Sequence, residues 1–223
     1  ILAKPKWDTT KALWSRHVAT PDGWTFVIPT HSDSPSHDYC VGYCYNSNIT
    51  SKEEAESNLL NMFDVEVTKH LKYKNYLAKN PIVDDRILLN GNRLFFLEPL
   101  ESSSIQAYLE CVRFFGNYII TQKAPLERAG SSAKRYIKQL QNFVLWHYQF
   151  GSKYDTPFWD YAKALSFKDS DFDALVSYVK NHDFDTCLPQ SHGGGTHNDC
   201  QYGQWPAFSF KIWYDGMTRR KEK

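Results

Sequence analysis

The stretch Arg93-Leu-Phe-Phe-Leu-Glu-Pro-Leu-Glu-Ser-Ser-Ser-Ile105 joins a short apolar run to a helix start that is crowded with carboxylates and hydroxyls. Residues 94–97 have the length and composition of a buried strand, and Glu98-Pro99 ends that strand. The three serines that follow are candidate N-caps, because a serine hydroxyl can accept a hydrogen bond from a first-turn backbone N–H. The stretch therefore predicts a strand, a turn and a helix, with Glu101 beside the positive end of the helix.

The helix start has two interpretations. Apolar residues recur at helical spacing after the serines, at Ile105, Tyr108, Leu109, Val112 and Phe115, so a helix is expected here. In one interpretation the serines cap this helix and Glu101 only complements its dipole, which is the common case for residues of these types. In the other, unpaired backbone N–H groups bind a small anion, and the nearby carboxylate handles a proton or polarises an electrophile.

A sequence signature favours the second interpretation. Residues 97–105 closely resemble the Phe-Leu-Glu-Pro-Leu-Glu-Ser-Thr-x-Ile signature of the flavin-dependent halogenases, the tryptophan-halogenase superfamily. In that family the second Glu is catalytic and the residues after it help to hold the halide. The resemblance implies that Glu101 is catalytic and that Ser102, Ser103 and Ser104 shape a halide site. Family members usually have Thr where Ser103 stands, which leaves the preferred halide open.

Two earlier segments predict an antiparallel pair of strands. Residues 23–29 form one strand and residues 38–46 the other, and small residues at Cys40, Gly42 and Cys44 suggest that something packs closely on one face. Trp24-Thr-Phe-Val-Ile-Pro29 resembles the Trp-x-Trp-x-Ile-Pro motif of flavin halogenases, and Gly42-Tyr-Cys-Tyr-Asn-Ser47 resembles the strand that usually follows it. The resemblance places four residues on the flavin and substrate side: Trp24, Phe26, Ile28 and Pro29. Phe26 keeps an aromatic ring but lacks the indole N–H of the motif.

The remaining elements are predicted mainly as helices. Ser51-Lys-Glu-Glu54 is a capping box that opens a helix to about Phe63, and residues 131–150 form a long amphipathic helix. Further helices start near residues 155–159 and 170–173, whereas residues 7–20 are a helical or irregular lead-in. Residues 69–79 interleave tyrosines and lysines, which could line an anionic cofactor but more often form an amphipathic face. Residues 142–148 and 155–159 also resemble halogenase patterns, so the resemblance covers residues 23–160.

Composition indicates a globular protein without a membrane or nucleic-acid role. The formal net charge is +1, 42% of the residues are hydrophobic, and no apolar run is long enough to span a bilayer. The five cysteines are an odd number without the dense spacing of a disulfide scaffold, so we expect reduced cysteines and a cytoplasmic location. The chain starts without Met or a signal peptide, which indicates an internal cut.

Residues 182–200 are the least predictable part of the chain. Cys187, His192, His197 and Cys200 could bind a metal, but their spacing fits no standard zinc site and a glycine run separates the histidines. We therefore expect no metal and a flexible loop.

An aromatic segment follows this loop. In the resembled family the corresponding segment lies near the substrate pocket, so the resemblance gives Tyr202, Trp205 and Trp213 a pocket role. The longer insert that grips free tryptophan in tryptophan-specific members is missing, and free tryptophan is therefore not the expected substrate.

These observations predict an α+β protein. Residues 1–100 are expected to be the end of a flavin-monooxygenase-like FAD module with antiparallel strands, and residues 101–223 a mainly helical substrate-side region of a larger chain. The glycine-rich dinucleotide fingerprint and the family's early catalytic Lys do not occur in this sequence.

The resemblance implies an FAD-dependent halogenase. Reduced flavin from a flavin reductase, O2 and halide would give hypohalous acid, which halogenates an electron-rich aromatic substrate, and the enzyme could be a homo-oligomer. Two alternatives stay open: a non-catalytic binding module, zinc-stabilised through the Cys187–Cys200 loop, and a flavin-dependent monooxygenase.

Overall fold

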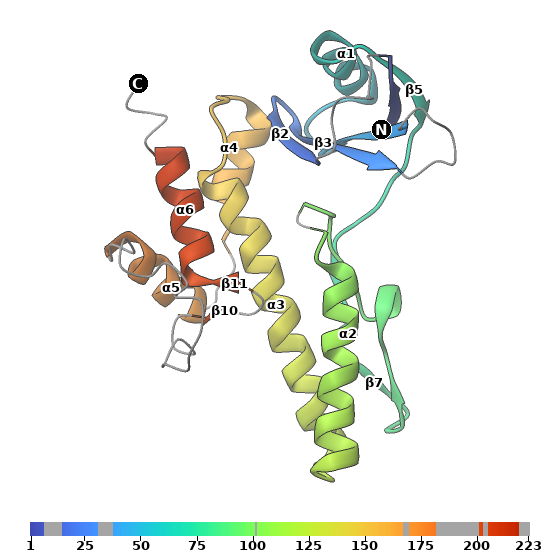
Figure 1. The fold of residues 1–223 in the computed structure, drawn as a ribbon, viewed down its shortest axis with the longest axis vertical. Helices are drawn as coiled ribbons and strands as arrows, with labels where there is room; N and C mark the ends of the chain where they lie inside the picture. Colours follow the sequence, from blue (N-terminus) through green and yellow to red (C-terminus); the bar gives the residue numbers. More distant parts are fainter. Residues whose placement is uncertain are drawn as a thin grey trace. The chain divides into compact units, whose positions relative to one another are not determined.

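The computed structural model describes residues 1–6, 15–30, 38–100, 102–166, 170–181, 201–202 and 205–218. Helices and antiparallel strands are combined in one chain, which confirms the predicted α+β class (Figure 1). The chain forms two compact units, unit 1 with residues 1–73 and 151–165, and unit 2 with residues 74–150 and 166–223. The expected boundary after residue 100 separates functional regions and stays a prediction, whereas the compact units divide the chain after Tyr73.

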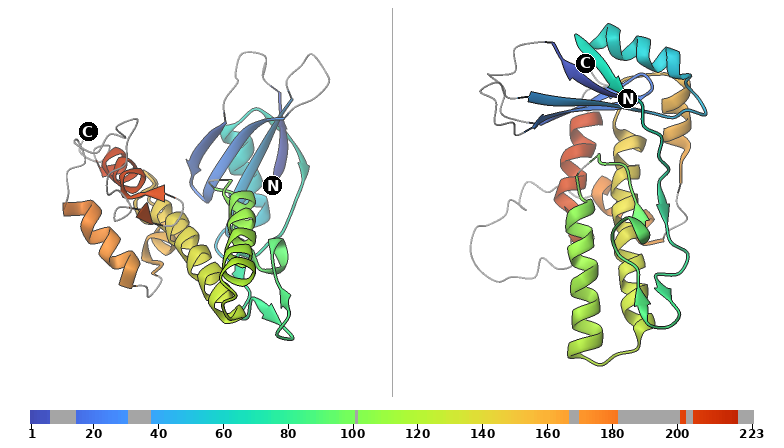
Figure 2. Two further views of the ribbon diagram at one scale, coloured as in Figure 1. Left: turned by 60° about the horizontal axis from the view of Figure 1, so that its bottom comes forward. Right: turned by 90° about the vertical axis from the view of Figure 1, so that its right-hand side faces the viewer.

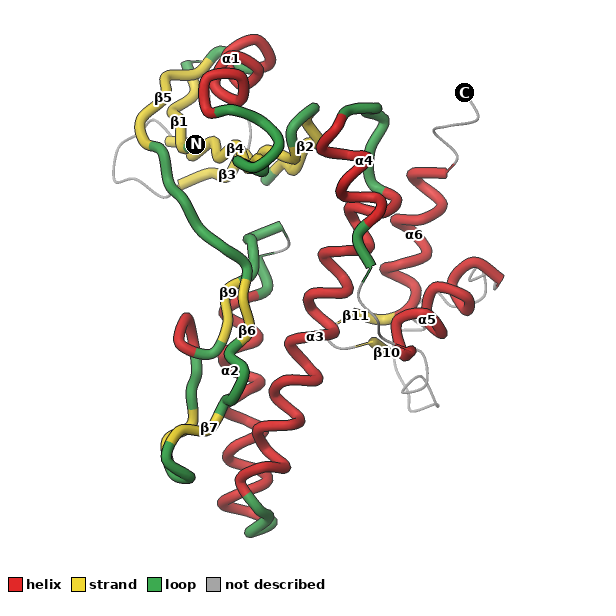
Figure 3. Tube along the Cα trace, turned by 180° about the vertical axis from the view of Figure 1, so that it is seen from behind, coloured by secondary structure: helices red, strands yellow, loops and turns green. Residues whose placement is uncertain are grey.

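Unit 1 contains a five-stranded sheet in the order β2-β3-β4-β1-β5. Its strands are β1 (Leu2–Pro5), β2 (Arg16–Thr20), β3 (Gly23–Thr30), β4 (Asp38–Tyr45) and β5 (Val65–Lys69), and all the neighbouring pairs are antiparallel (Figure 3). The predicted pairing of β3 with β4 is confirmed, with Phe26 opposite Gly42. Pro29 lies beyond the part of β3 that pairs with β2, where the missing N–H costs no ladder bond on that side.

One strand of this sheet differs from the sequence-based expectation, and another was not predicted. Residues 16–20 were expected to be helical or irregular, but they form β2, and Leu2–Pro5 inserts between β4 and β5. Neither segment alternates strongly in polarity, so pairing with a neighbouring strand decides its structure. The β1 strand adds Ala3, which is 2% exposed, to the core of the unit.

Helix α1 (Lys52–Met62) packs its apolar side into the core that the sheet provides. Ala55 and Leu59 are fully buried there, together with Val41 and Val65. The predicted N-cap is confirmed, because Ser51 Oγ accepts a hydrogen bond from the backbone N–H of Glu54 at 3.1 Å.

A buried carboxylate ties α1 to the sheet. Asp22 Oδ2 accepts hydrogen bonds from Tyr43 Oη at 2.6 Å and from Asn58 Nδ2 of α1 at 2.8 Å, and Asp22 Oδ1 accepts one from Thr50 Oγ1 at 3.2 Å. Burial, together with the Asp22 carboxylate, raises the pKa of Tyr43 well above its usual range. Three donors share the Asp22 carboxylate, and this network fixes the position of α1.

Helix α4 (Pro157–Ala164) completes unit 1, and Pro157 lies in its first turn as predicted. Trp159 Nε1 donates to the Thr20 carbonyl at 2.7 Å, and Thr156 Oγ1 donates to the Pro21 carbonyl at 2.7 Å. These bonds attach α4 to the β2–β3 turn.

Unit 2 is mainly helical. Its helices are α2 (Ser104–Phe115), the π-helical turn η2 (Gly116–Thr121), α3 (Leu126–Phe150), α5 (Ser170–Asn181) and α6 (Ala207–Thr218). Its short strand pairs are β6 (Tyr76–Leu77) with β9 (Phe95–Phe96), β7 (Ile82–Val83) with β8 (Ile87–Leu88), and β10 (Gln201–Tyr202) with β11 (Trp205–Pro206), and the 3-10 turn η1 (Gly91–Arg93) precedes β9. Residues 70–75 form no regular element, so the tyrosines and lysines there do not share a helix face.

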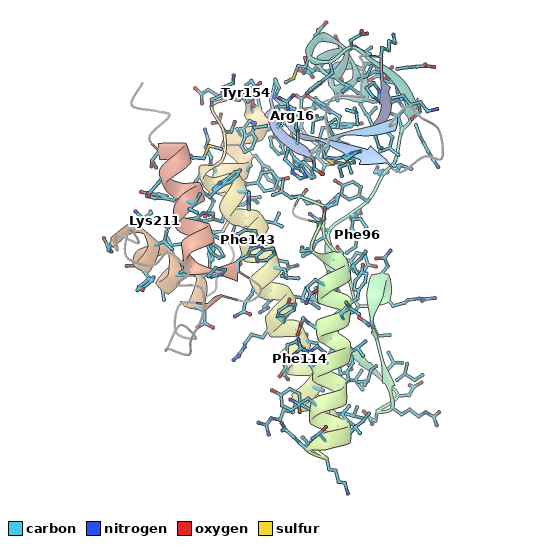
Figure 4. All side chains as sticks on the ribbon, viewed as in Figure 1. Arg16, Phe96, Phe114, Phe143, Tyr154 and Lys211 are labelled. Carbon is cyan, nitrogen blue, oxygen red and sulfur yellow. The ribbon has the colours of Figure 1, made fainter. Side chains whose placement is uncertain are left out.

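Helices α2 and α3 lie side by side in unit 2 (Figure 2). Ala107 and Cys111 of α2 are fully buried with Ile137 and Leu140 of α3. Phe114 lies on the α3 side of α2 (Figure 4), where its ring meets Tyr136 edge-on at 5.7 Å between centroids. The inner face of α2 is thus built from small residues together with the partly buried rings of Tyr108, Phe114 and Phe115.

The more apolar face of α2 points away from this core. Ile105, Leu109 and Val112 are all exposed, although apolar residues at this spacing usually mark the buried face of a helix. Small residues face α3 instead, because they allow the two backbones to approach closely.

Candidate functional site

The loop between β9 and α2 carries the predicted halide residues. Leu97 and Leu100 are buried and anchor the loop, and the Ser102 backbone N–H donates to the Pro99 carbonyl at 3.2 Å. Ser102 has a φ of +51°, in the left-handed region that few residues other than glycine adopt. Glu101 lies outside the described residues. The structure therefore brings Ser102, Ser103 and Ser104 together at one helix start.

The N-cap residue of α2 does not cap the helix with its side chain. Ser103 occupies the N-cap position in a helical conformation, with φ −81° and ψ −8°, and its side chain makes no capping hydrogen bond. The first N–H groups of a helix have no acceptor within the helix. Ser103 is also only 8% exposed, which places this end of the helix dipole in a partly dry environment. Chemically, the arrangement suits a small anion better than a closed cap does.

Glu98 has a different setting from the serines. Its backbone N–H donates to Asn75 Oδ1 at 2.8 Å, which fixes the residue on the β9 side of Pro99. One oxygen of its carboxylate, Oε1, is buried. Glu98 is therefore held through its backbone on the strand side of the loop.

The predicted flavin-side motif lies on β3 in unit 1. Trp24, Phe26 and Ile28 share one face of the sheet, opposite the face on which Val27 joins the α1 core, and Pro29 follows on the Val27 side. Trp24 is 3% exposed, and its indole N–H finds no acceptor among the residues that the structure describes. A buried unpaired donor of this kind is rare in a complete protein.

The small residue at position 42 has a defined partner. A Cβ atom at Gly42 would overlap the ring of Phe26, which lies directly over it. The sequence suggested that something packs closely on this face of β4, and the structure identifies it as Phe26. The centroids of the Trp24 and Phe26 rings are 5.8 Å apart, and those of the His17 and Trp24 rings are 5.6 Å apart.

The predicted pocket aromatics gather around the second half of α3 in unit 2. The Trp205 ring stacks on Phe143 at 3.8 Å with an interplanar angle of 17°, and the Trp213 ring lies 4.2 Å from His147. Figure 4 shows Phe143 on α3. Tyr202 pairs with Trp205 in the β10–β11 ladder. Trp205 and Trp213 therefore lie against neighbouring positions of one helix.

Sequence reasoning missed the α3 residues that hold these aromatics. His147 is 6% exposed, its Nδ1 lies 2.8 Å from the Phe143 carbonyl, and its ring meets Phe143 edge-on at 4.7 Å. Trp146 Nε1 donates to the Phe210 carbonyl at 3.1 Å and so ties α3 to α6. Phe143 and His147 are four residues apart, so they are neighbours on one helix face. They also lie in a segment that resembles a halogenase pattern, and these two features could have identified them.

The possible metal loop, Cys187, His192, His197 and Cys200, lies outside the described residues. Elsewhere in the described part of the chain, no three His, Cys, Asp or Glu side chains come close enough to hold a metal ion. Within the same residues, every helix is too short or too polar to cross a bilayer.

A protein-family model and several curated proteins match this chain. The family model described as tryptophan halogenase matches residues 4–191. The tryptophan 6-halogenase ThaL of Streptomyces albogriseolus is 23% identical over 172 residues, which are 74% of this chain and 31% of that protein. The tryptophan 7-halogenase KtzQ of Kutzneria sp. (strain 744) is also 23% identical over 172 residues, which are 74% of this chain and 31% of that protein. The chain thus spans about a third of the length of the curated relatives it matches.

Solved structures show the same fold. The tryptophan 6-halogenase SttH from Streptomyces toxytricini superposes with a TM-score of 0.70 at 20% identity, over 96% of this chain and 40% of that one. The tryptophan halogenase from Shewanella frigidimarina gives a TM-score of 0.65 at 16% identity, over 96% and 41%. At these identities the likeness concerns the fold alone.

Proposed function

Because this chain belongs to the tryptophan halogenase family, we propose that it forms part of an FAD-dependent halogenase that acts on an electron-rich aromatic substrate. One observation carries the proposal: the family match over residues 4–191 includes a halogenase signature whose serines stand at a helix start that Ser103 does not cap with its side chain. The proposed enzyme uses reduced FAD from a flavin reductase, O2 and halide, and the halogen reaches the arene by way of hypohalous acid.

The start of α2 is proposed to hold the halide. Its backbone N–H groups and the hydroxyls of Ser102, Ser103 and Ser104 supply donors, and the helix dipole favours an anion at this end. The left-handed backbone of Ser102 is consistent with a functional turn, because strained residues often occur at ligand sites.

Glu101 is proposed as the catalytic carboxylate. It directly precedes the serines in the sequence, so it can take the arene proton or polarise the halogenating species next to the halide. Glu98 has no such role in this proposal, because its backbone is fixed on the strand side of Pro99.

The described residues of unit 1 fit part of a flavin site. Trp24 offers a buried indole N–H without an acceptor, and Phe26 extends the same aromatic face of the sheet. These residues would contact the cofactor, with Ile28 and Pro29 continuing the motif. Reduced FAD would supply two electrons to O2, and the halide would supply the other two as it becomes an electrophilic halogen.

The aromatic substrate is proposed to bind beside α3. Trp205 and Trp213 lie next to Phe143 and His147, and aromatic side chains favour an electron-rich ring through offset or edge contacts. Tyr202 continues this segment.

The test is an assay of the full-length protein with FAD, a flavin reductase, NADH and O2. Free tryptophan, a tryptophan-containing peptide and a simple indole are offered with chloride or bromide, and the products are analysed by mass spectrometry. Halogenated product that depends on the halide supports the proposal. Hydroxylated product formed equally without halide favours a monooxygenase, and no turnover of any aromatic with intact flavin oxidation contradicts the proposal.

A further inference from the structure

The first half of α2 is held by the turn η1, which precedes β9. Asn90 Nδ2 donates to the Tyr108 carbonyl at 3.2 Å, and Tyr108 Oη donates to Asn92 Oδ1 at 2.6 Å. Gly91, between the two asparagines, has a φ of +58°, in the left-handed region that glycine adopts most easily. Two side chains from one short turn therefore bind both the backbone and the side chain of Tyr108.

A ring contact joins α2 to the same part of the chain. Strand β9 lies beside α2 (Figure 3), and the centroids of the Phe95 and Tyr108 rings are 5.2 Å apart. Phe95 is fully buried, so its ring is fixed by the core of unit 2. We call this ring contact and the two hydrogen bonds the Tyr108 clamp. The signature residues 97–105 lie between its two sides in the sequence.

The strand side of the clamp is fixed without help from α2. Tyr76 Oη donates to the Asn92 carbonyl, and the Ala78 N–H donates to the Leu94 carbonyl at 2.7 Å. Strands β6 and β9 also pair here. The turn η1 is thus attached to a supporting strand pair, and the clamp transmits the position of this pair to α2.

The clamp lies one helical turn from the start of α2. Tyr108 follows Ser104, the first residue of the helix, by four positions, which is about 6 Å along the helix axis. On the other side of the loop, the Glu98 N–H donates to Asn75 Oδ1 at 2.8 Å. Because both ends of the signature loop are held in this way, the position of the first N–H groups of α2 depends on the Tyr108 clamp.

One atom of the clamp is left unsatisfied. Asn90 Oδ1 is buried and has no hydrogen-bond partner among the residues that the structure describes. A buried acceptor without a partner lowers stability, so stability alone does not favour an asparagine here. Departures of this kind are expected mainly where a residue serves a function.

We propose that Tyr108 is a positioning residue of the halide site and acts through Asn92 and Asn90. This inference rests on the proposed function, which assigns the halide to the start of α2. The clamp holds the first N–H groups of the helix where a small anion can accept their hydrogen bonds, since these bonds depend strongly on distance and angle. Chloride is smaller than bromide and requires closer donors, so the clamp favours chloride binding.

The first test measures KM for chloride and for bromide in the full-length enzyme, with FAD, a flavin reductase, NADH, O2 and an aromatic that the parent halogenates. Tyr108→Phe keeps the ring beside Phe95 and removes the bond to Asn92. The KM for chloride should rise about three- to tenfold, as the loss of one ordinary hydrogen bond predicts. The KM for bromide should rise less, and kcat at saturating halide should stay near the parental value.

Tyr118→Phe is the matched control. Tyr118 lies in η2, beyond the other end of α2, and its ring faces the Arg128 guanidinium at 5.0 Å. The variant keeps this ring and should have the parental KM for both halides.

A double-mutant cycle separates positioning from a general loss of structure. If Tyr108 acts through Asn92, the variant with both Tyr108→Phe and Asn92→Ala should have no higher KM for chloride than the single variants. Additive effects, or a parental KM in Tyr108→Phe, would overturn the positioning role of Tyr108. A fall in kcat alone would also overturn it, because a merely structural role lowers the amount of active enzyme.

Hydrogen exchange gives a readout that requires no activity. In the FAD-free full-length protein, Tyr108→Phe should speed amide exchange in residues 102–108 and leave α5 unchanged. Parental exchange in residues 102–108 would show that Tyr108 does not hold the helix start. A parent that halogenates no aromatic would contradict the proposed function, whereas an active parent whose Tyr108→Phe variant keeps the parental KM contradicts only the role of Tyr108.

Discussion

Helices α1 and α2 both start after a serine, yet the two starts differ. Ser51 has an extended backbone, with φ −69° and ψ 160°, and its hydroxyl accepts the Glu54 N–H. Ser103 has a helical backbone and makes no side-chain cap, and Ser102 before it is left-handed. Among the residues that the structure describes, a serine side chain therefore caps α1, whereas the Ser103 side chain does not cap α2. An open helix start of this kind is available to a ligand, whereas a capped one is complete by itself.

The two helices also differ in what their apolar residues do. Ala55 and Leu59 of α1 are fully buried, and Asn58 of α1 donates to the buried Asp22. On α2, by contrast, the large aliphatic residues are exposed and small ones are buried. Helix α1 thus buries its apolar side within its own unit, whereas α2 leaves its large aliphatic side chains exposed among the residues that the structure describes.

The largest effect on stability is expected at the carboxylate that holds α1. Asp22→Ala removes the acceptor of Tyr43, Thr50 and Asn58, so the free energy of unfolding should fall by about 3–4 kcal/mol. Urea unfolding followed by circular dichroism measures this. Asp64→Ala, at an exposed site in the same unit, is the control and should change it by less than about 0.5 kcal/mol. Equal losses in both variants would show that the network does not hold α1.

A smaller loss is expected on the face of the sheet away from α1. In Gly42→Ala the new methyl group overlaps the Phe26 ring, and the forced shift should cost about 1–3 kcal/mol in unfolding free energy. Phe26→Leu in the same chain provides a smaller partner, so the double variant should lose less than the sum of the two single changes. Strict additivity in this double-mutant cycle would contradict the contact.

The inner face of α2 predicts a pH dependence. Burial raises the pKa of the Cys111 thiol to about 11, with Glu110 adding to the shift. The stability linked to this raised pKa is fully present below the pKa of the unfolded thiol and is lost as the pH rises toward 11. The slope should approach about 1.4 kcal/mol per pH unit between these values. Unfolding at several pH values measures this, and Cys111→Ala should flatten the slope. If Cys111→Ala left the slope unchanged, the pH dependence of stability would come from other groups, such as Tyr136.

The smallest effect compares the two serines directly. Ser51→Ala removes a cap and should cost about 1 kcal/mol in unfolding free energy. Ser103→Ala removes no cap bond and should cost less than about 0.5 kcal/mol. Thermal unfolding of both variants tests the comparison between the helix starts. A loss at Ser103 as large as that at Ser51 would mean that Ser103 caps its helix after all.

Much of the fold could be predicted from local patterns. The β3–β4 pair, the Ser51 cap and the starts of α4 and α5 follow from turn, cap and alternation signals within a few residues. The strands β1 and β2 could not be predicted in this way, because β1 exists only through pairing with strands far along the chain. The buried face of α2 could not be predicted either, because its small residues do not form a recognisable hydrophobic periodicity.

The candidate site could be predicted only in part. The signature around Ser102 located the helix start. Residue types alone, however, predict neither the left-handed backbone of Ser102 nor the lack of a side-chain cap at Ser103. Phe143 and His147 were missed as partners of Trp205 and Trp213, because contacts between α3 and the aromatic segment depend on tertiary packing.

The central claim is that the open start of α2 is an active site, and Glu101→Gln in the full-length enzyme tests it most directly. Glutamine keeps the size of the side chain and removes its charge and basicity. The rate of halogenation should therefore fall by roughly 10²-fold or more, while flavin reoxidation by O2 continues. Glu98→Gln is the matched control and should cost less activity, since Glu98 is fixed on the strand side of Pro99. A folded Glu101→Gln enzyme that halogenates at the parental rate would contradict the claim.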